Sequence, residues 1–254
     1  MTRTAWLPFG APADAETTLL CLPHAGAGAS VYRTWGRGLH PLVAVRPLQP
    51  PGRERRREEP PYTAAGPLAR DLARTIIAAV PCRYALFGHS TGAICAFETV
   101  RELRRLGAPP PVHLFVSGRR APRLPMVRHD LAALSVAQLA DVLRDLGGTP
   151  EDVLAQPGLL ATLQPVLAAD FALNEGYPYL PEEPLAVPIT AFAGEHDPGA
   201  DPAAMAGWAD ETAAPFRLHL LDGGHFAVFE RAAEVHAAMG AALTGTATAA
   251  AERS

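Results

Sequence analysis

The sequence predicts an α/β fold in which a mostly parallel central sheet carries helices on both faces. Six short apolar runs, bounded by Gly or Pro as buried strands are, alternate with segments whose apolar residues recur at helical spacing. Such alternation is typical of a parallel sheet covered on both sides. The alternation breaks once, over roughly residues 125–180, where two or three helical stretches follow one another without a strand. We therefore predict a single domain, residues 1–254, with a helical lid insertion at about 125–180.

Each element can be assigned in order along the chain. The expected strands are residues 19–23, 42–48, 84–89, 112–118, 188–194 and 216–224. The expected helices of the main body lie at about 30–38, 68–80, 91–106 and 205–212, with a last one from about residue 226. Open α/β sheets place their sites at the carboxyl ends of the strands, so we expect the insertion to cover that edge.

Bulk composition narrows the functional classes. The chain has 254 residues, 48% hydrophobic and 19% charged, which suits one sizeable core. It has no apolar run of about 18 residues and no signal-type N-terminus, so we expect a cytoplasmic protein without a membrane span. A net charge of −4 argues against nucleic acid as a partner. The basic residues are all arginine, which excludes a lysine Schiff base. The three separated cysteines predict reduced core residues.

A serine at the end of the third expected strand is the strongest functional signal. Gly88-His89-Ser90-Thr91-Gly92 matches G-x-S-x-G, the nucleophile elbow of the α/β-hydrolase fold. The chain turns sharply from strand to helix there, and glycines two residues either side prevent collisions. The helix N-terminus favours developing negative charge, and the Thr91 amide can donate to an oxyanion. We expect His89 to pack beneath the elbow.

A serine nucleophile needs a base held by a carboxylate, and in this fold the order is Ser, acid, His. Asp197 ends GEHD after one expected strand, and His225 ends DGGH after the next. We predict Ser90 as nucleophile, His225 as general base and acid, and Asp197 as its orienting partner. His196 remains an alternative base and Asp201 an alternative acid.

A second oxyanion donor should come from the loop after the first expected strand. PHAGAGAS, residues 23–30, is glycine-rich but lacks the G-x-x-x-x-G-K-[ST] form of a phosphate loop. Its glycines permit a close approach of backbone to a reacting carbonyl. We predict the Ala25 amide as the donor, the alternative being that the glycines only build a turn.

The chain resembles the type II thioesterases that accompany polyketide synthases and non-ribosomal peptide synthetases. The stretches that carry the resemblance are LPHAGAGAS, PPGRERRREEP, FGHSTG, VSGRRAPRLP, DFALNEGYPY, PLAVPITAFAGEHD and DGGHF. The arginine-bearing PGRE and SGRRAP stretches are the most specific. The same triad, Ser90, Asp197 and His225, and the same amides, of Ala25 and Thr91, follow from the resemblance.

The resemblance also implies an activity. Such enzymes hydrolyse acyl thioesters on the phosphopantetheine arm of acyl or peptidyl carrier proteins, which clears stalled or misprimed units. They accept short acyl-CoA compounds as mimics and need no metal and no cofactor. The family usually has methionine after the nucleophile, so Thr91 should alter the wall of the acyl pocket.

Two partner hypotheses follow from the charged and apolar residues near the insertion. Carrier proteins are acidic, so some of Arg119, Arg120, Arg123 and Arg128 could contact the carrier, or form a solvated face. The arginines of residues 53–57 are a second candidate. The apolar helical face of the insertion should close over the acyl chain or pack on the body; it consists of Leu139, Val142, Leu143 and Leu146.

Two rival functions remain open from sequence. A carboxylester hydrolase or an acyltransferase would use the same triad with a different leaving group or acceptor. A non-catalytic acyl-binding protein on the same scaffold would have no need of Ser90, Asp197 and His225 together.

Overall fold

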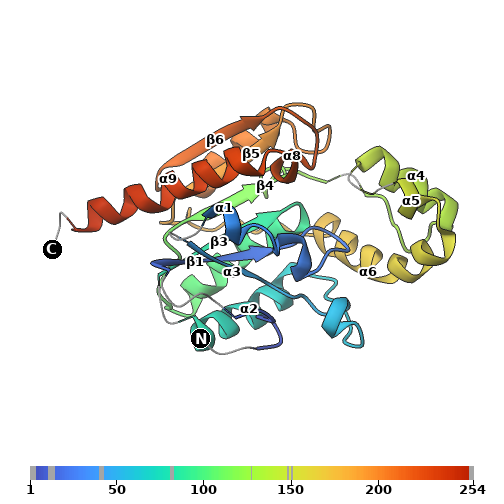
Figure 1. Ribbon diagram of the computed structural model, residues 1–254, viewed down its shortest axis with the longest axis horizontal. Coiled ribbons are helices and arrows are strands. Elements are labelled where there is room, and N and C mark those ends of the chain that lie inside the picture. Colours follow the sequence, from blue (N-terminus) through green and yellow to red (C-terminus); the bar gives the residue numbers. More distant parts are fainter. Residues whose placement is uncertain are drawn as a thin grey trace.

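The sheet has the predicted strands in the predicted order along the chain. The computed structural model describes residues 4–10, 15–39, 43–80, 83–126, 128–147, 149 and 151–251. The strands are β1 (Thr17–Leu22), β2 (Val43–Pro47), β3 (Tyr84–His89), β4 (Leu114–Ser117), β5 (Ile189–Gly194) and β6 (Phe216–Leu221). They lie in the order β2-β1-β3-β4-β5-β6 and every neighbouring pair is parallel (Figure 1).

Helices cover both faces of the sheet. Side chains alternate along each strand, so each strand presents apolar residues to a core on either face. Leu20 and Leu22 of β1 pack into the core beneath α2 (Ala65–Ala79) and α3 (Thr91–Arg105). Leu19 and Cys21 point into the opposite core, under α1 (Gly36–Leu39) and α9 (Ala232–Ala251). Two short helices, α7 (Pro202–Ala206) and α8 (Ala227–Glu230), follow β5 and β6. The predicted α/β architecture is confirmed.

A helical insertion separates β4 from β5. It consists of α4 (Val136–Leu146), α5 (Glu151–Leu154) and α6 (Pro157–Glu175). Ser135 caps the N-terminus of α4 in a capping box. The Gln138 amide donates to the Ser135 hydroxyl oxygen, and the Ser135 amide donates to the side-chain oxygen of Gln138. The buried residues of the insertion form a separate apolar cluster that includes Leu139, Leu143 and Leu160. In Figure 1, α6 extends from the body and α4 and α5 lie beyond it.

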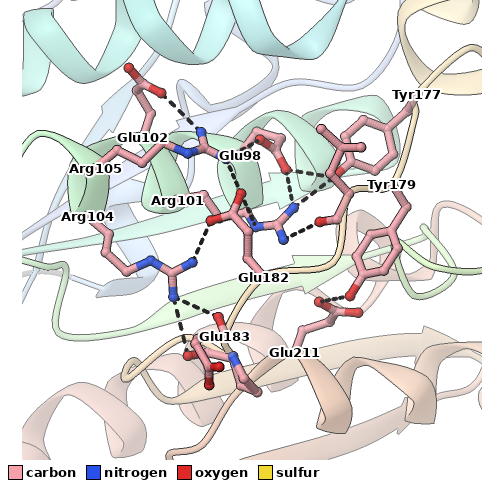
Figure 2. Close-up of polar contacts among 12 residues, drawn as sticks. Glu98, Arg101, Glu102, Arg104, Arg105, Tyr177, Tyr179, Glu182, Glu183 and Glu211 are labelled. Carbon is pink, nitrogen blue, oxygen red and sulfur yellow. Dashed lines mark hydrogen bonds and ion pairs between the residues drawn. The ribbon is translucent and has the colours of Figure 1, made fainter.

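The chain returns from this insertion along α3, where ion pairs fix it. Arg101 on α3 donates to Glu98 at 2.9 Å and to the Leu180 carbonyl at 2.6 Å. The Tyr177 hydroxyl donates to the same Glu98 at 2.6 Å, and Arg104 pairs with Glu182 at 2.7 Å (Figure 2). Since α3 begins at the elbow, the insertion is tied to the helix that carries the nucleophile.

Two further sequence expectations can be compared with the structure. Cys21 and Cys95 are buried free thiols, as predicted, and Cys82 lies outside the described residues. Within the described part of the chain, no helix has the length and apolar character that crossing a bilayer requires.

Buried histidines predict acid sensitivity of the fold. Burial, with a smaller contribution from Arg217, lowers the pKa of His113 to about 4, and its Nε2 lies 2.8 Å from Thr190 Oγ1. The unfolded chain therefore takes up this proton first as the pH falls from about 6.5, so stability is lost towards pH 4. His113→Gln should reduce that loss, measured by urea unfolding at several pH values, by about 2 to 3 kcal/mol between pH 7 and pH 4.

Exposed His196 provides the control for this measurement. His196→Gln should leave the dependence of the unfolding free energy on pH unchanged. Equal slopes for the wild type and the His113 variant would contradict the assignment of the acid sensitivity to His113.

Candidate active site

Ser90 occupies the sharp turn between β3 and α3. Its φ is 54°, in the left-handed region that a non-glycine residue rarely adopts, and its amide donates to the Ser117 carbonyl at 2.8 Å. A Cβ on Gly88 would lie 2.1 Å from the Gly92 carbonyl oxygen, and one on Gly92 would lie 2.4 Å from the Leu22 carbonyl oxygen. The expected steric reason for both glycines is therefore present in the structure.

The predicted acid and base meet at the ends of neighbouring strands. Asp197 follows β5, His225 follows β6, and His225 Nδ1 lies 2.7 Å from Asp197 Oδ2. The second oxygen, Oδ1, accepts from the amides of Gly199 at 2.9 Å and Ala200 at 3.1 Å. Burial opposes ionisation of Asp197, but His225 and these amides together hold the pKa of its carboxyl below its usual range. The carboxylate thus stays charged against the ring of His225.

Ser90, Asp197 and His225 line one cavity of about 290 Å³. Ala25 and Thr91 lie in its wall as well. Helices of the insertion supply most of the apolar remainder, namely Leu143, Leu146, Leu160, Leu163, Leu167 and Phe171. Among the described residues no hydrogen bond joins the Ser90 hydroxyl to His225; in free hydrolases that contact is often long and tightens with substrate.

The alternative base and acid take other positions. His196 is exposed and does not line the cavity. Asp201 caps α7, where its side chain accepts from the Ala204 amide at 2.8 Å. His89 is fully buried beneath the elbow, as expected, with its ring centroid 4.9 Å from that of His225. Of these candidates, the Asp197–His225 pair is the one that lines the cavity with Ser90 and can orient a base there.

The backbone amides of the glycine-rich loop differ in their hydrogen bonds. The Gly26 amide donates to Asp170 Oδ2 at 2.7 Å, and the Ala27 amide donates to the His24 carbonyl at 3.2 Å. The amides of Ala25 and Thr91 donate no hydrogen bond to any described residue. These are the two amides predicted for the oxyanion.

Sequence analysis missed the interaction that holds this loop. Arg53 and Asp170 form a buried bidentate ion pair, with Nη1 2.7 Å from Oδ2 and Nη2 2.9 Å from Oδ1. Asp170 lies on α6 and also accepts the Gly26 amide, while Arg53 Nη1 reaches the Ala27 carbonyl at 3.4 Å. The carboxylate of Asp170 within the otherwise apolar run VLAADFAL, residues 166–173, was the signal that could have revealed it.

The hypothesis that the arginines of residues 53–57 contact a carrier protein is therefore wrong for two of them, Arg53 and Arg56. Arg53 is buried in the pair with Asp170, and Arg56 is buried in a pair with Glu59 at 2.6 Å. Glu54, between them, accepts the Ser30 hydroxyl at 2.6 Å. This loop binds the glycine-rich loop of its own chain.

The hypothesis that arginines near the insertion contact the carrier also needs correction. Arg119 is only 2% exposed, and its Nε donates to Asn174 Oδ1 at 2.8 Å. Its side chain is therefore not part of an exposed arginine face. Arg120 donates to the Gly199 carbonyl at 3.1 Å, Arg123 pairs with Asp210, and Arg128 is exposed.

A third histidine completes the wall beside the base. His24 stacks edge-on against His89 and Phe226, at centroid distances of 5.7 and 5.1 Å. Burial, then the nearby charges of His225 and Arg53, lower the pKa of His24 to about 4. Burial and the same His225 hold the pKa of His89 well below its usual value. Both rings are therefore neutral near pH 7. Within the described residues no three His, Cys, Asp or Glu side chains form a metal-binding group.

Known proteins are similar to this chain in sequence and in fold. The family model of the thioesterase domain matches residues 17–243. Gramicidin S biosynthesis protein GrsT of Aneurinibacillus migulanus is 38% identical over 216 residues, which cover 85% of this chain and 84% of GrsT.

Two solved structures are similar over almost the whole chain. RedJ, a thioesterase from the prodiginine pathway of Streptomyces coelicolor, is 39% identical, has a TM-score of 0.84 and covers 91% of each chain. BorB, the type II thioesterase from the borrelidin biosynthetic cluster, is 34% identical, has a TM-score of 0.86 and covers 96% of this chain and 99% of its own. The chain belongs to the thioesterase family, among the type II enzymes of polyketide and non-ribosomal peptide biosynthesis.

Proposed function

We propose that this thioesterase uses Ser90 to hydrolyse acyl thioesters from the phosphopantetheine arms of carrier proteins. The observation that carries the proposal is the common apolar cavity, which the elbow serine and the Asp197–His225 pair both line. RedJ and BorB come from pathways that build natural products, which supports a carrier-bound acyl group as the substrate. Short acyl-CoA compounds carry the same arm and would serve as mimics.

Acylation begins with the Ser90 hydroxyl. His225 Nε2 removes its proton while Ser90 Oγ attacks the thioester carbonyl, and Asp197 stabilises the imidazolium through Nδ1. The oxyanion of the tetrahedral intermediate accepts hydrogen bonds from the amides of Ala25 and Thr91, at the positive end of α3. The C–S bond then breaks, and His225 returns its proton to the departing pantetheine thiolate.

Deacylation repeats these steps with water. His225 takes a proton from a water molecule, which attacks the Ser90 ester, and then returns the proton to Ser90 Oγ as the free acid leaves. This sequence needs neither a metal nor a cofactor. The cytoplasmic location remains a prediction from the sequence.

Acyl-chain selection would fall to the insertion. Leu143 and Leu146, predicted to close over the acyl chain, line the cavity, whereas Leu139 and Val142 pack inside the insertion's own apolar cluster. The position of Leu143 and Leu146 supports the expectation that this face contacts the acyl chain, whereas Leu139 and Val142 pack within the insertion and not, as the alternative stated, on the body. Thr91, where the family usually has methionine, adds a short polar side chain to the wall beside Ser90.

The nucleophile can be tested directly. Ser90→Ala should lower kcat for hexanoyl-CoA hydrolysis by at least about a thousandfold, because no acyl-enzyme can form. A fluorophosphonate probe should label the wild type and not the variant, and the thermal midpoint should confirm that the variant is folded. A folded Ser90→Ala variant with wild-type turnover would refute the mechanism. An unlabelled, inactive wild type would favour a non-catalytic acyl-binding protein.

The buried ion pair that holds the glycine-rich loop should affect catalysis without touching substrate. Asp170→Asn weakens the acceptor for Arg53 and for the Gly26 amide, which lets the neighbouring Ala25 amide drift from the oxyanion. We expect kcat for hexanoyl-CoA to fall roughly 10- to 100-fold while KM changes less than about threefold.

Glu59→Gln is the matched control for this positioning residue. It removes the carboxylate partner of Arg56, in the same loop, without any contact to the glycine-rich loop. A purely structural role for Asp170 would lower the thermal midpoint and leave kcat of the folded fraction unchanged, and that result would contradict the positioning role.

The acyl cavity can be shortened at Leu163 on α6. Leu163→Trp should fill part of the cavity and lower kcat/KM for decanoyl-CoA at least about tenfold more than for acetyl-CoA, since overpacking excludes the longer chain. Leu159→Trp, at an exposed position of the same helix that does not line the cavity, should leave the ratio unchanged. Equal losses for both substrates in Leu163→Trp would place the acyl chain elsewhere.

A further inference from the structure

A second, polar cavity of about 280 Å³ lies beside the acyl cavity. The two share three lining residues, Met126, Asn174 and Glu175. They also meet along the backbone after β4, where Gly118 lines the acyl cavity and Arg119 lines the polar one. A ligand long enough to leave the acyl cavity past these residues would reach the polar cavity.

Arg119 is a buried cation that has no counter-ion in the described part of the chain. Its Nε donates to Asn174 and its Nη1 to the Arg120 carbonyl at 2.8 Å, both neutral oxygens. No described carboxylate lies within ion-pair distance, and Nη2 has no hydrogen-bond partner among the described residues. The Trp208 indole holds the Arg119 backbone by donating to its carbonyl at 2.7 Å. A buried, unpaired charge is costly, and an anionic ligand would offset that cost.

The other charges around this cavity leave it positive. Arg128 is exposed and forms no ion pair with a described residue. Arg123 forms an ion pair with Asp210. The one acid in the wall, Glu175, is already occupied by His129, whose Nδ1 lies 2.7 Å and whose amide lies 3.0 Å from its oxygens.

The hydroxyl groups of the two tyrosines in the wall are already occupied. Tyr177 donates to Glu98, and Tyr179 donates to Glu211 at 3.2 Å (Figure 2). Among the side chains of the described lining, the guanidinium groups and the amide nitrogen of Asn174 remain as donors for a ligand. A planar guanidinium is suited to bidentate contact with phosphate.

We propose that this polar cavity binds the phosphate group of the phosphopantetheine arm, with Arg119 at its base and Arg123 and Arg128 at its rim. The assignment rests on the proposed function, since it takes the thioester at Ser90 as the other end of the arm. The phosphate is common to carrier-bound substrates and to CoA.

Two substrates that differ only in the phosphate test the assignment. Hexanoyl-phosphopantetheine should be hydrolysed by the wild type with a kcat/KM roughly tenfold above that of hexanoyl-pantetheine, mainly through KM. Arg128→Gln and the double variant with Arg123→Gln should reduce this ratio to about threefold or less. Arg57→Gln, which removes an equally exposed arginine elsewhere, should preserve the ratio.

Arg119→Lys keeps the charge but loses the guanidinium fork, and should lower the same ratio if its thermal midpoint shows a folded protein. Calorimetry with phosphopantetheine and pantetheine, both without an acyl group, measures the phosphate effect independently of turnover. Tighter binding of phosphopantetheine by the wild type, lost in Arg128→Gln, would support the site.

The outcomes separate this assignment from the proposed function. Equal kcat/KM for both hexanoyl substrates in the wild type, or a ratio unchanged in the double variant, would overturn the phosphate site and leave the thioesterase mechanism intact. A loss confined to hexanoyl-CoA would overturn it too, because the cavity would then bind the nucleotide end of CoA. Failure to hydrolyse either thioester, with phosphate-dependent binding retained, would refute the mechanism and keep the site.

Discussion

The bidentate ion pair between Arg53 and Asp170 is the constraint on which the geometry of this site depends. It joins the loop after β2, the insertion helix α6 and, through the Gly26 amide, the glycine-rich loop that faces the nucleophile. Breaking a buried pair of this kind by removing one partner costs roughly 3–5 kcal/mol, because the remaining charge stays uncompensated. The insertion and the oxyanion loop are thereby held to one another, and the acyl cavity between them has a fixed wall.

Parallel strand topology supplies the rest of the arrangement. The elbow follows β3, Asp197 follows β5 and His225 follows β6, and these parallel strands end at the same edge of the sheet. The strained φ of Ser90 is maintained because glycines on both sides allow the close approach of strand and helix. The strain is confined to Ser90, and the packing of the surrounding sheet and α3 holds the residue in this conformation.

The electrostatic environment differs between the two cavities. Around His225, buried His24 and His89 are neutral near pH 7, and the carboxylate of Asp197 is the charged group that contacts its ring. The neighbouring polar cavity instead contains arginines in excess of acids. An apolar chamber for the acyl group beside a cationic chamber suits a substrate that is apolar at one end and anionic at the other.

The sequence by itself determined the fold class, the six strands, the presence of a helical insertion and the placement of Ser90, Asp197 and His225 directly after strands. These depend on local signals: short continuous apolar runs bounded by Gly or Pro, the glycines of the elbow, and polar residues directly after strands. Tertiary structure decided which charges are buried. Arg53, Arg56 and Arg119 occur in arginine-rich stretches that resemble solvated surface. The burial of Arg53 and Arg119 depends on partners far along the chain, Asp170 and Asn174, which the packing of α6 against the body brings close, whereas Arg56 pairs with nearby Glu59.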